Sequence, residues 1–339
     1  MKISLPDLET IKSLKFASEL GCLSVNEPVT VVANMNWVRP FGMFLTAMAL
    51  KQFRKKYSDI PFQLELGSSK GIDYAGHMGF FKTISPQILV GKLPGEANGN
   101  RNYIPISELD ILQIHRAEIE NGNFIEIGDA VEKESQRLSQ ILSRDNQQIH
   151  ILLTYLIREI LRNIPEHAEI NKAWICGQFW NDDTAEIAIV DEGIGVKSSL
   201  QKNRVHISYA SNDEEALRMS IKSGISQAFN PSKTNRSNEL WANSGFGLFM
   251  ASEICKRLDG SFCIASGGKY LRADSDNGVI IGDTNISGTA VKITISTSGL
   301  ENSKAIMSEM ATQGELQAKA IRNAFKKAST PSKGLIHGI

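Results

Sequence analysis

The stretch "LIREILRNIPEHAE" (156–169) combines a helical pattern of apolar residues with a polar residue at every fourth position. These polar residues are Glu159, Asn163 and His167. Because residues four positions apart lie above one another on a helix, Glu159 and Asn163 are expected on one flank, beside the apolar stripe that faces the core. Pro165 cannot donate a backbone N–H, so we expect the helix to kink or end near it. That leaves open whether His167 points the same way.

A carboxylate and two glycines follow directly after a predicted strand. The segment "TAEIAIV" (184–190) is predicted to be a strand, and "DEGIGV" then places Asp191, Gly193 and Gly195 at its C-terminal end. Ligands bind at such strand ends in α/β folds, and glycine lets the backbone approach a ligand closely. On its own, this motif is equally compatible with a tight turn.

Two further glycine motifs occur later in the chain. In "NSGFGLFMASEICKRL" (243–258), Gly245 and Gly247 come immediately before a predicted helix, where free N–H groups and the positive end of the helix dipole suit a phosphate group. In "NISGTAVKITI" (285–295), Gly288 and Thr289 open a predicted strand. Each motif alone is also explained by an ordinary turn.

Taken in order, the four motifs resemble the ATP-binding boxes of the GHKL superfamily, whose domain is called the Bergerat fold. Gyrase-type topoisomerases, heat-shock chaperones, mismatch-repair ATPases, histidine kinases and anti-sigma-factor kinases belong to this group. The resemblance covers about residues 130–298. It implies an α/β sandwich, in which helices cover a mixed sheet, and it implies ATP and Mg²⁺ as ligands.

The resemblance also assigns roles to single residues. Asn163 is expected to ligate Mg²⁺, which takes few protein ligands and completes its shell with phosphates and water. Glu159 matches the general base that activates a water molecule towards the γ-phosphate. Asp191 is expected to accept a hydrogen bond from the exocyclic amine of adenine. This contact would select adenine over guanine.

Six more positions are implied to contact the nucleotide, and they are Gly193, Gly195, Gly245, Gly247, Leu248 and Thr289. The first two would shape the adenine pocket, and the last would complete the adenine contacts through its hydroxyl. The other three would cradle the phosphates, Leu248 through its backbone N–H. The interval 197–244 corresponds to the ATP lid of the family. Within it, Lys233 and Arg236 are either γ-phosphate ligands or solvated lid charges.

The N-terminal part of the chain predicts a separate small α/β unit. A strand is expected over 27–37, a helix from Pro40, a second strand over 62–67 and a second helix over 72–84. We expect this unit to span 1–125.

Part of this unit resembles a STAS domain, the fold of anti-sigma-factor antagonists. The resemblance lies in "FQLELGSSKGIDYAGHMGFF" (62–81), where Tyr74 and Ala75 stand in place of the serines that are phosphorylated in that family. It implies a recognition module that cannot be phosphorylated in the usual way. The alternative is an unrelated small α/β domain.

The rest of the chain divides into two parts. The ATP-binding domain is expected over 126–300, and a C-terminal helix with a tail over 301–339. Apolar periodicity predicts the following helices and strands for these parts: helices 130–144, 147–164, 247–259 and 303–327, and strands 172–180, 184–190, 260–267 and 289–297. The helix after Ala130 and the C-terminal helix are candidate homodimer contacts; packing within the chain is the alternative.

Composition narrows the range of partners. The 339 residues include 37 basic and 37 acidic side chains, so the formal net charge is zero. A protein without net positive charge has no overall field that attracts a nucleic acid or an anionic membrane, and we expect neither as a partner. No apolar run approaches the roughly 18 residues of a membrane span, and the N-terminus has no hydrophobic signal core. We therefore expect a soluble cytoplasmic protein.

The four cysteines lack the spacing of a metal site or a disulfide framework. They are expected to be buried reduced thiols: Cys22, Cys176, Cys255 and Cys263.

Three functions remain open at this stage. The first is an ATP-driven switch that hydrolyses Mg·ATP slowly and controls an unidentified protein partner. The second is a serine/threonine kinase of the anti-sigma-factor type, and the third is a module that binds ATP without catalysis. Two-component autophosphorylation is disfavoured, because histidine kinases usually carry Asn at the position of Glu159. The upstream His115 and His150 also lack the acidic residue and proline that follow a phosphoacceptor in that family.

Overall fold

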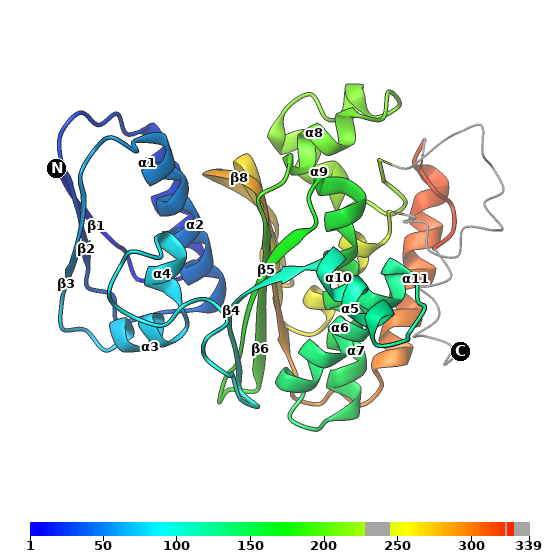
Figure 1. Ribbon diagram of the computed structural model, residues 1–339. Coiled ribbons are helices and arrows are strands. Elements are labelled where there is room, and N and C mark those ends of the chain that lie inside the picture. The colour runs from blue at the N-terminus through cyan, green and yellow to red at the C-terminus, as the bar shows by residue number, and fades with distance from the viewer. Residues whose placement is uncertain (228–244, 323, 329–339) are drawn as a thin grey trace.

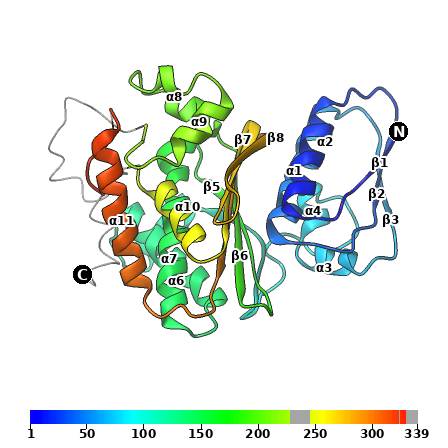
Figure 2. The same ribbon diagram turned by 180° about the vertical axis from the view of Figure 1, so that it is seen from behind.

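The computed structural model describes residues 1–227, 245–322 and 324–328. These residues form an α/β protein in which sheets and helices alternate as layers (Figures 1 and 2). A three-stranded parallel sheet lies at one end, followed by a layer of helices. A five-stranded antiparallel sheet comes next, and a second set of helices covers its far face.

The outer sheet is parallel and has the order β1-β2-β3. Crossover helices connect its strands, so the unit alternates strand and helix as predicted. Its elements are β1 (Lys2–Ser4), α1 (Thr10–Cys22), β2 (Val29–Ala33), α2 (Pro40–Lys56) and β3 (Phe62–Leu66). The predicted strand 27–37 is therefore confined to β2, while α2 matches the predicted helix.

The second helix predicted for this unit is divided in two. Instead of one helix over 72–84, the structure has α3 (Gly71–His77) and α4 (Phe80–Ile84). Gly79 lies between them with φ of 94°, a left-handed conformation that interrupts the helix and that residues other than glycine rarely adopt.

The inner sheet is antiparallel throughout its described strands, so the prediction of a mixed sheet is wrong. Its order is β4-β5-β6-β8-β7. Its strands are β4 (Tyr103–Asp110), β5 (Lys172–Phe179), β6 (Thr184–Asp191), β7 (Ser261–Asp274) and β8 (Gly278–Ser296). Since β4 begins at Tyr103, this sheet takes in residues that the predicted boundary at 125/126 assigns to the N-terminal unit.

The strands β7 and β8 form one long hairpin, and this alters two predictions. The predicted strands 260–267 and 289–297 are both much shorter than the strands observed. Gly288 and Thr289 consequently lie inside β8 rather than at its start, beside an irregularity of register at Gly267. The turn 275–277 joins the two arms, and the Asp274 side chain accepts the backbone N–H of Asn277 at 2.7 Å.

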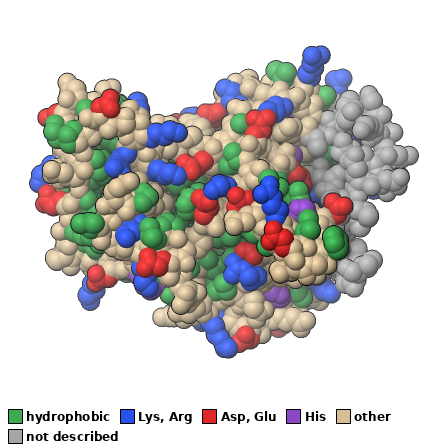
Figure 3. Space-filling view, viewed as in Figure 1, with side chains coloured by type: hydrophobic (Ala, Val, Ile, Leu, Met, Phe, Trp, Pro, Cys, Tyr) green, Lys and Arg blue, Asp and Glu red, His purple; other side chains and the backbone are tan. Residues whose placement is uncertain are grey.

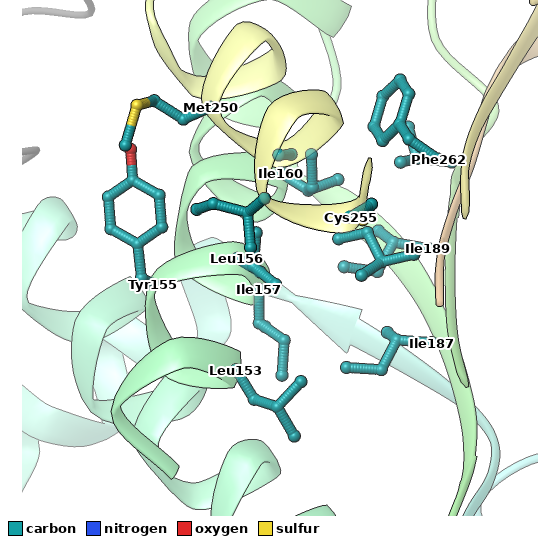
Figure 4. Packing of buried hydrophobic residues seen from close by; sticks show 14 of the residues in the cluster. Leu153, Tyr155, Leu156, Ile157, Ile160, Ile187, Ile189, Met250, Cys255 and Phe262 are labelled. Atoms are coloured by element: carbon teal, nitrogen blue, oxygen red, sulfur yellow. The ribbon is translucent and has the colours of Figure 1, made fainter. Parts of the chain in front are cut away.

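Helices cover one face of the inner sheet. They are α5 (Ile111–Glu120), α6 (Ile127–Leu142), α7 (Gln147–Asn163), α10 (Gly247–Arg257) and α11 (Ser303–Ala320). Figure 4 shows α7 placing Leu156 and Ile160 among side chains of the sheet and of α10, such as Ile189 and Cys255. The helix α11 ends at Ala320, earlier than the predicted 327, and its buried residues pack within the chain.

The N-terminal unit covers the other face of the inner sheet. Small side chains of this face are fully or almost fully buried in one cluster with α1 and α2: Cys176, Ala188, Val190, Cys263, Ala265 and Ala290. Among them lies the fully buried Glu186, which accepts the N–H of Phe41 at 3.2 Å and pairs with Arg39 at 3.5 Å. The inner sheet is thus buried on both faces.

Charged side chains of both signs lie on the visible surface (Figure 3), and the cysteines form no disulfide. On the face seen in Figure 3, basic and acidic side chains are interspersed. In the described part of the chain, no helix is both long and apolar enough to cross a membrane. All four cysteines are free thiols; three are buried as predicted, whereas Cys22 is exposed.

Candidate functional site

A cavity opens between the helix-covered face of the inner sheet and the segments that follow β6. The empty space between its walls, including the open mouth, is about 800 Å³. Its walls are mainly aliphatic and come from α7 and the turn that follows it, β6, the short helix α8 (Gly195–Gln201), the segment 220–227, α10, β7 and β8. These wall residues are Ile160, Ile164, Ile189, Val196, Leu200, Ile225, Leu248, Ile264 and Val291.

The structure brings most of the predicted site residues to this cavity. Seven of the nine line it, namely Asn163, Asp191, Gly195, Gly245, Gly247, Leu248 and Thr289. Gly193 and Glu159 do not. They lie immediately behind its walls, each for a different reason.

Asp191 supplies a buried carboxylate at the cavity floor. Only 8% of the residue is exposed, and its Oδ1 accepts the N–H of Gly193 at 2.9 Å. Thr289 lies directly opposite Asp191 on the neighbouring strand β8. Burial raises the pKa of Asp191 to about 6, although hydrogen bonds from Gly193 and Thr289 act in the opposite direction. An ionised carboxylate has about four acceptor sites, so Asp191 can also accept a hydrogen bond from a ligand in the cavity.

Gly193 allows two loops to approach one another closely. A Cβ at this position would lie 2.3 Å from the carbonyl oxygen of Ala168. The next N–H, that of Ile194, donates to the same carbonyl at 3.1 Å. Gly193 thus shapes the site from behind, by letting the loop after β6 pack on the end of the α7 segment.

Pro165 does not turn the chain away from the cavity. Beyond Asn163, the helix continues as one π-helical turn (Ile164–Ala168), with Pro165 in its first turn, where no N–H is needed. His167 consequently lines the cavity. Burial lowers the pKa of His167 to about 4, so the imidazole is neutral at pH 7. The question that the sequence left open is answered: His167 faces the same cavity as Asn163.

A polar chain joins His167 to the segment that follows α9 (Asp213–Ser220). Gln227 is hydrogen-bonded to His167 and accepts the Ser199 hydroxyl at 2.8 Å. Asn203 donates to the Gln227 carbonyl at 2.8 Å. The described part of the predicted lid, residues 197–227, is therefore folded against the cavity. Lys233 and Arg236 lie outside the described residues.

The N-terminus of α10 faces the cavity through its first two residues. The N–H of Met250 donates to the Phe246 carbonyl at 2.8 Å. Gly247 and Leu248 precede that bond, and the N–H groups in a first helical turn have no partner within the helix. Since both residues line the cavity, they offer backbone donors and a positive dipole end to a ligand.

Glu159 is held by a residue that the sequence analysis did not identify. Its Oε1 accepts two hydrogen bonds from Arg158, at 2.6 Å from Nη2 and 3.2 Å from Nε. Arg158 is only 2% exposed and also donates to Glu132 at 3.1 Å. Burial opposes the charge of Arg158, but attraction by Glu159 and Glu132 outweighs it and raises the pKa of Arg158 above its ordinary value. Adjacent helical residues do not usually face each other, so spacing gave no signal for this pair.

Two side chains of α2, Lys51 and Gln52, connect the N-terminal unit with residues beside the cavity. Lys51 of α2 pairs with Glu192 at 2.8 Å, next to Asp191 in the chain. Gln52 accepts the N–H of Ser287 at 3.1 Å, next to Gly288. The helix α2 therefore contributes to fixing the cavity floor from the opposite side of the sheet.

No protein-family model matches the chain. The search among curated proteins finds no match either.

Proposed function

We propose that this protein binds Mg·ATP in the cavity and hydrolyses it slowly, as a conformational switch that acts on a protein partner. The observation that carries the proposal is the convergence of Asp191, Asn163 and the N-terminus of α10 on one largely apolar cavity. The order of these motifs along the chain, and their positions at strand and helix ends, supports a Bergerat-type site.

An adenine ring suits the floor and walls of the cavity. A flat aromatic base needs apolar surfaces on its faces and a polar partner at its edge. The Asp191 carboxylate would accept the exocyclic amine of adenine, whereas guanine would direct a carbonyl oxygen at the same carboxylate. Thr289, paired with Asp191 across the sheet, lies where a second edge contact would form.

The opposite part of the cavity suits phosphates. Gly247 and Leu248 offer the N-terminus of α10, and Asn163 offers an amide oxygen. Among the described residues, no group of three or more His, Cys, Asp or Glu could hold a metal ion. A magnesium ion at Asn163 would therefore take its remaining ligands from phosphates and water, as this ion commonly does, and would neutralise charge on the phosphates.

Glu159 is the residue that would accept the proton of the attacking water. Its carboxylate lies against Gly247, since a Cβ there would be 2.6 Å from Oε2. It does not line the cavity, and Arg158 holds its other oxygen. A base in this position supports slow hydrolysis rather than rapid turnover.

The proposal is tested by incubating the protein with γ-labelled Mg·ATP. We expect labelled phosphate to be released without labelled protein, and Glu159→Ala to lower release at least about 100-fold, to a small residual rate, while ATP still binds. Label on a serine of a co-purified partner would favour the kinase instead. Binding without any hydrolysis, before and after the substitution, would leave only a non-catalytic ATP module.

ATP affinity is expected to fall as the pH drops below 6. Asp191 has a pKa of about 6 in the free protein, and only its ionised form accepts the amine without a competing proton. We expect the Kd to be constant above pH 7 and to rise by up to about tenfold per pH unit below 6. Calorimetric titrations between pH 5 and 8 measure this. A flat profile would show that Asp191 does not contact the ligand.

A further inference from the structure

Arg158 occupies a position from which it can control the Glu159 carboxylate. It is almost completely buried, and three of its N–H groups have carboxylate acceptors: two donate to Glu159 and one to Glu132 of α6. Its guanidinium also lies 5.1 Å from the ring centre of Tyr155. These contacts hold Arg158 in one orientation between two helices.

The two oxygens of Glu159 have different surroundings. Oε1 takes both hydrogen bonds from Arg158, while Oε2 lies against Gly247 at the start of α10. Two charged N–H groups of Arg158 converge on the same oxygen, so the carboxylate is anchored through Oε1 by charge-assisted hydrogen bonds. Oε2 lies on the side of Gly247, where the absence of a side chain leaves room for it.

Removing Arg158 would leave two carboxylates without their shared cation. Glu159 is 5% exposed, so water cannot replace the lost hydrogen bonds at little cost. Without the anchor at Oε1 the carboxylate would rotate, and this would remove the base from its working position. The cavity walls, Asp191 and Asn163 would be unaffected, because Arg158 does not line the cavity.

We propose that Arg158 is a positioning residue for hydrolysis, which acts through Glu159 and is itself held by Glu132. This inference rests on the proposed ATPase function. It assigns to Arg158 the orientation of the base and no part in binding ATP. Arg158 should therefore affect turnover and leave the affinity for ATP unchanged.

The test combines kinetics with a double-mutant cycle. We expect Arg158→Met to lower kcat at least about tenfold, with KM and the Kd for ATP within about twofold of the unmodified protein. In the Glu159→Ala background, the same change should cause no further loss. Arg158→Lys keeps the positive charge but not the two converging donors, so its kcat should lie between those of Arg158→Met and the unmodified protein. The Lys variant can also be measured if the Met variant does not fold.

Arg137→Met is the matched control. Arg137 also makes two hydrogen bonds to a glutamate, Glu134 on α6; neither residue lines the cavity or forms a hydrogen bond or ion pair with Glu159. Its kcat should equal that of the unmodified protein. Unchanged turnover in Arg158→Met or Arg158→Lys, a higher KM, or an equal loss in the Glu159→Ala background would overturn the inference while leaving the ATPase proposal intact. If the unmodified protein neither binds nor hydrolyses ATP, the proposed function itself fails.

Discussion

Replacing Asp191 with Asn is expected to abolish tight ATP binding and, at the same time, to stabilise the unliganded protein. The amide would direct N–H donors at the adenine amine, so we expect affinity to fall about 10- to 100-fold. The same change removes a buried charge from the floor of the cavity. Calorimetric titration measures the first effect, and chemical denaturation at pH 7.5 measures the second.

The sign of the stability effect follows from the pKa of Asp191. It is about 6 in the folded protein, against an ordinary value of 3.8, so ionisation favours the unfolded chain. The cost is fully present above pH 6 and disappears as the pH falls from 6 towards 3.8. A shift of about two units corresponds to roughly 3 kcal/mol as an upper limit, and we expect a gain of about 1–3 kcal/mol at pH 7.5.

Controls separate this effect from a general one. Asp276→Asn, on the exposed turn between β7 and β8, should change neither affinity nor stability. At pH 4.5 the stability difference between Asp191→Asn and the unmodified protein should be much smaller than at pH 7.5. Unchanged ATP affinity in Asp191→Asn would contradict the pocket assignment. A loss of stability at pH 7.5 would contradict the account of the buried charge.

Removing residues 1–99 is expected to prevent the remainder from existing as a soluble folded monomer. The truncation would expose the small apolar side chains of the inner sheet that now pack against α1 and α2, such as Val190, Ala265 and Ala290. Exposed patches of this kind drive association. Glu186 would also lose both Arg39 and the N–H of Phe41.

Size-exclusion chromatography and circular dichroism of the truncated chain provide the measurement. We expect aggregates or a loss of native structure, and rescue when residues 1–99 are supplied as a separate polypeptide in the same cell. A monomeric truncated chain with the ATP affinity of the full protein would show that the two units are independent. That outcome would support the prediction of a separate N-terminal unit.

The parts of the site that could be predicted lie at the ends of regular elements. Asp191 follows a strand and Gly247 starts a helix, and in both cases local chemistry indicates a ligand-binding position before any tertiary contact is known. The proximity of Arg158 to Glu159 could not be predicted, because it depends on the side-chain orientation that Glu132 imposes from a different helix.

Three features of the fold could not be predicted from the sequence, each for a physical reason. The strand β4 contains Pro105, which weakens a strand prediction, and its pairing with β5 shifts register between Ile104 and Ser107 around this proline. The helix α1 was not predicted, because charged residues are interspersed with the apolar ones it buries, such as Leu14 and Leu20. Burial of the inner sheet on both faces is a tertiary property, and β6 alone does not reveal which layer covers each side.

The central position of β6 has a consequence for motion. It pairs with β5 and β8 and is buried along almost its whole length, beneath helices on one face and the N-terminal unit on the other. Amide hydrogens of such a strand exchange only when large parts of the protein open. Asp191 therefore lies on a strand whose amides are expected to exchange slowly, whereas α8 and residues 220–227 form the cavity wall farther from the centre of the sheet. We therefore expect a ligand to change amide hydrogen exchange mainly in that wall. The exchange rates of the β6 amides should stay constant and can serve as an internal reference.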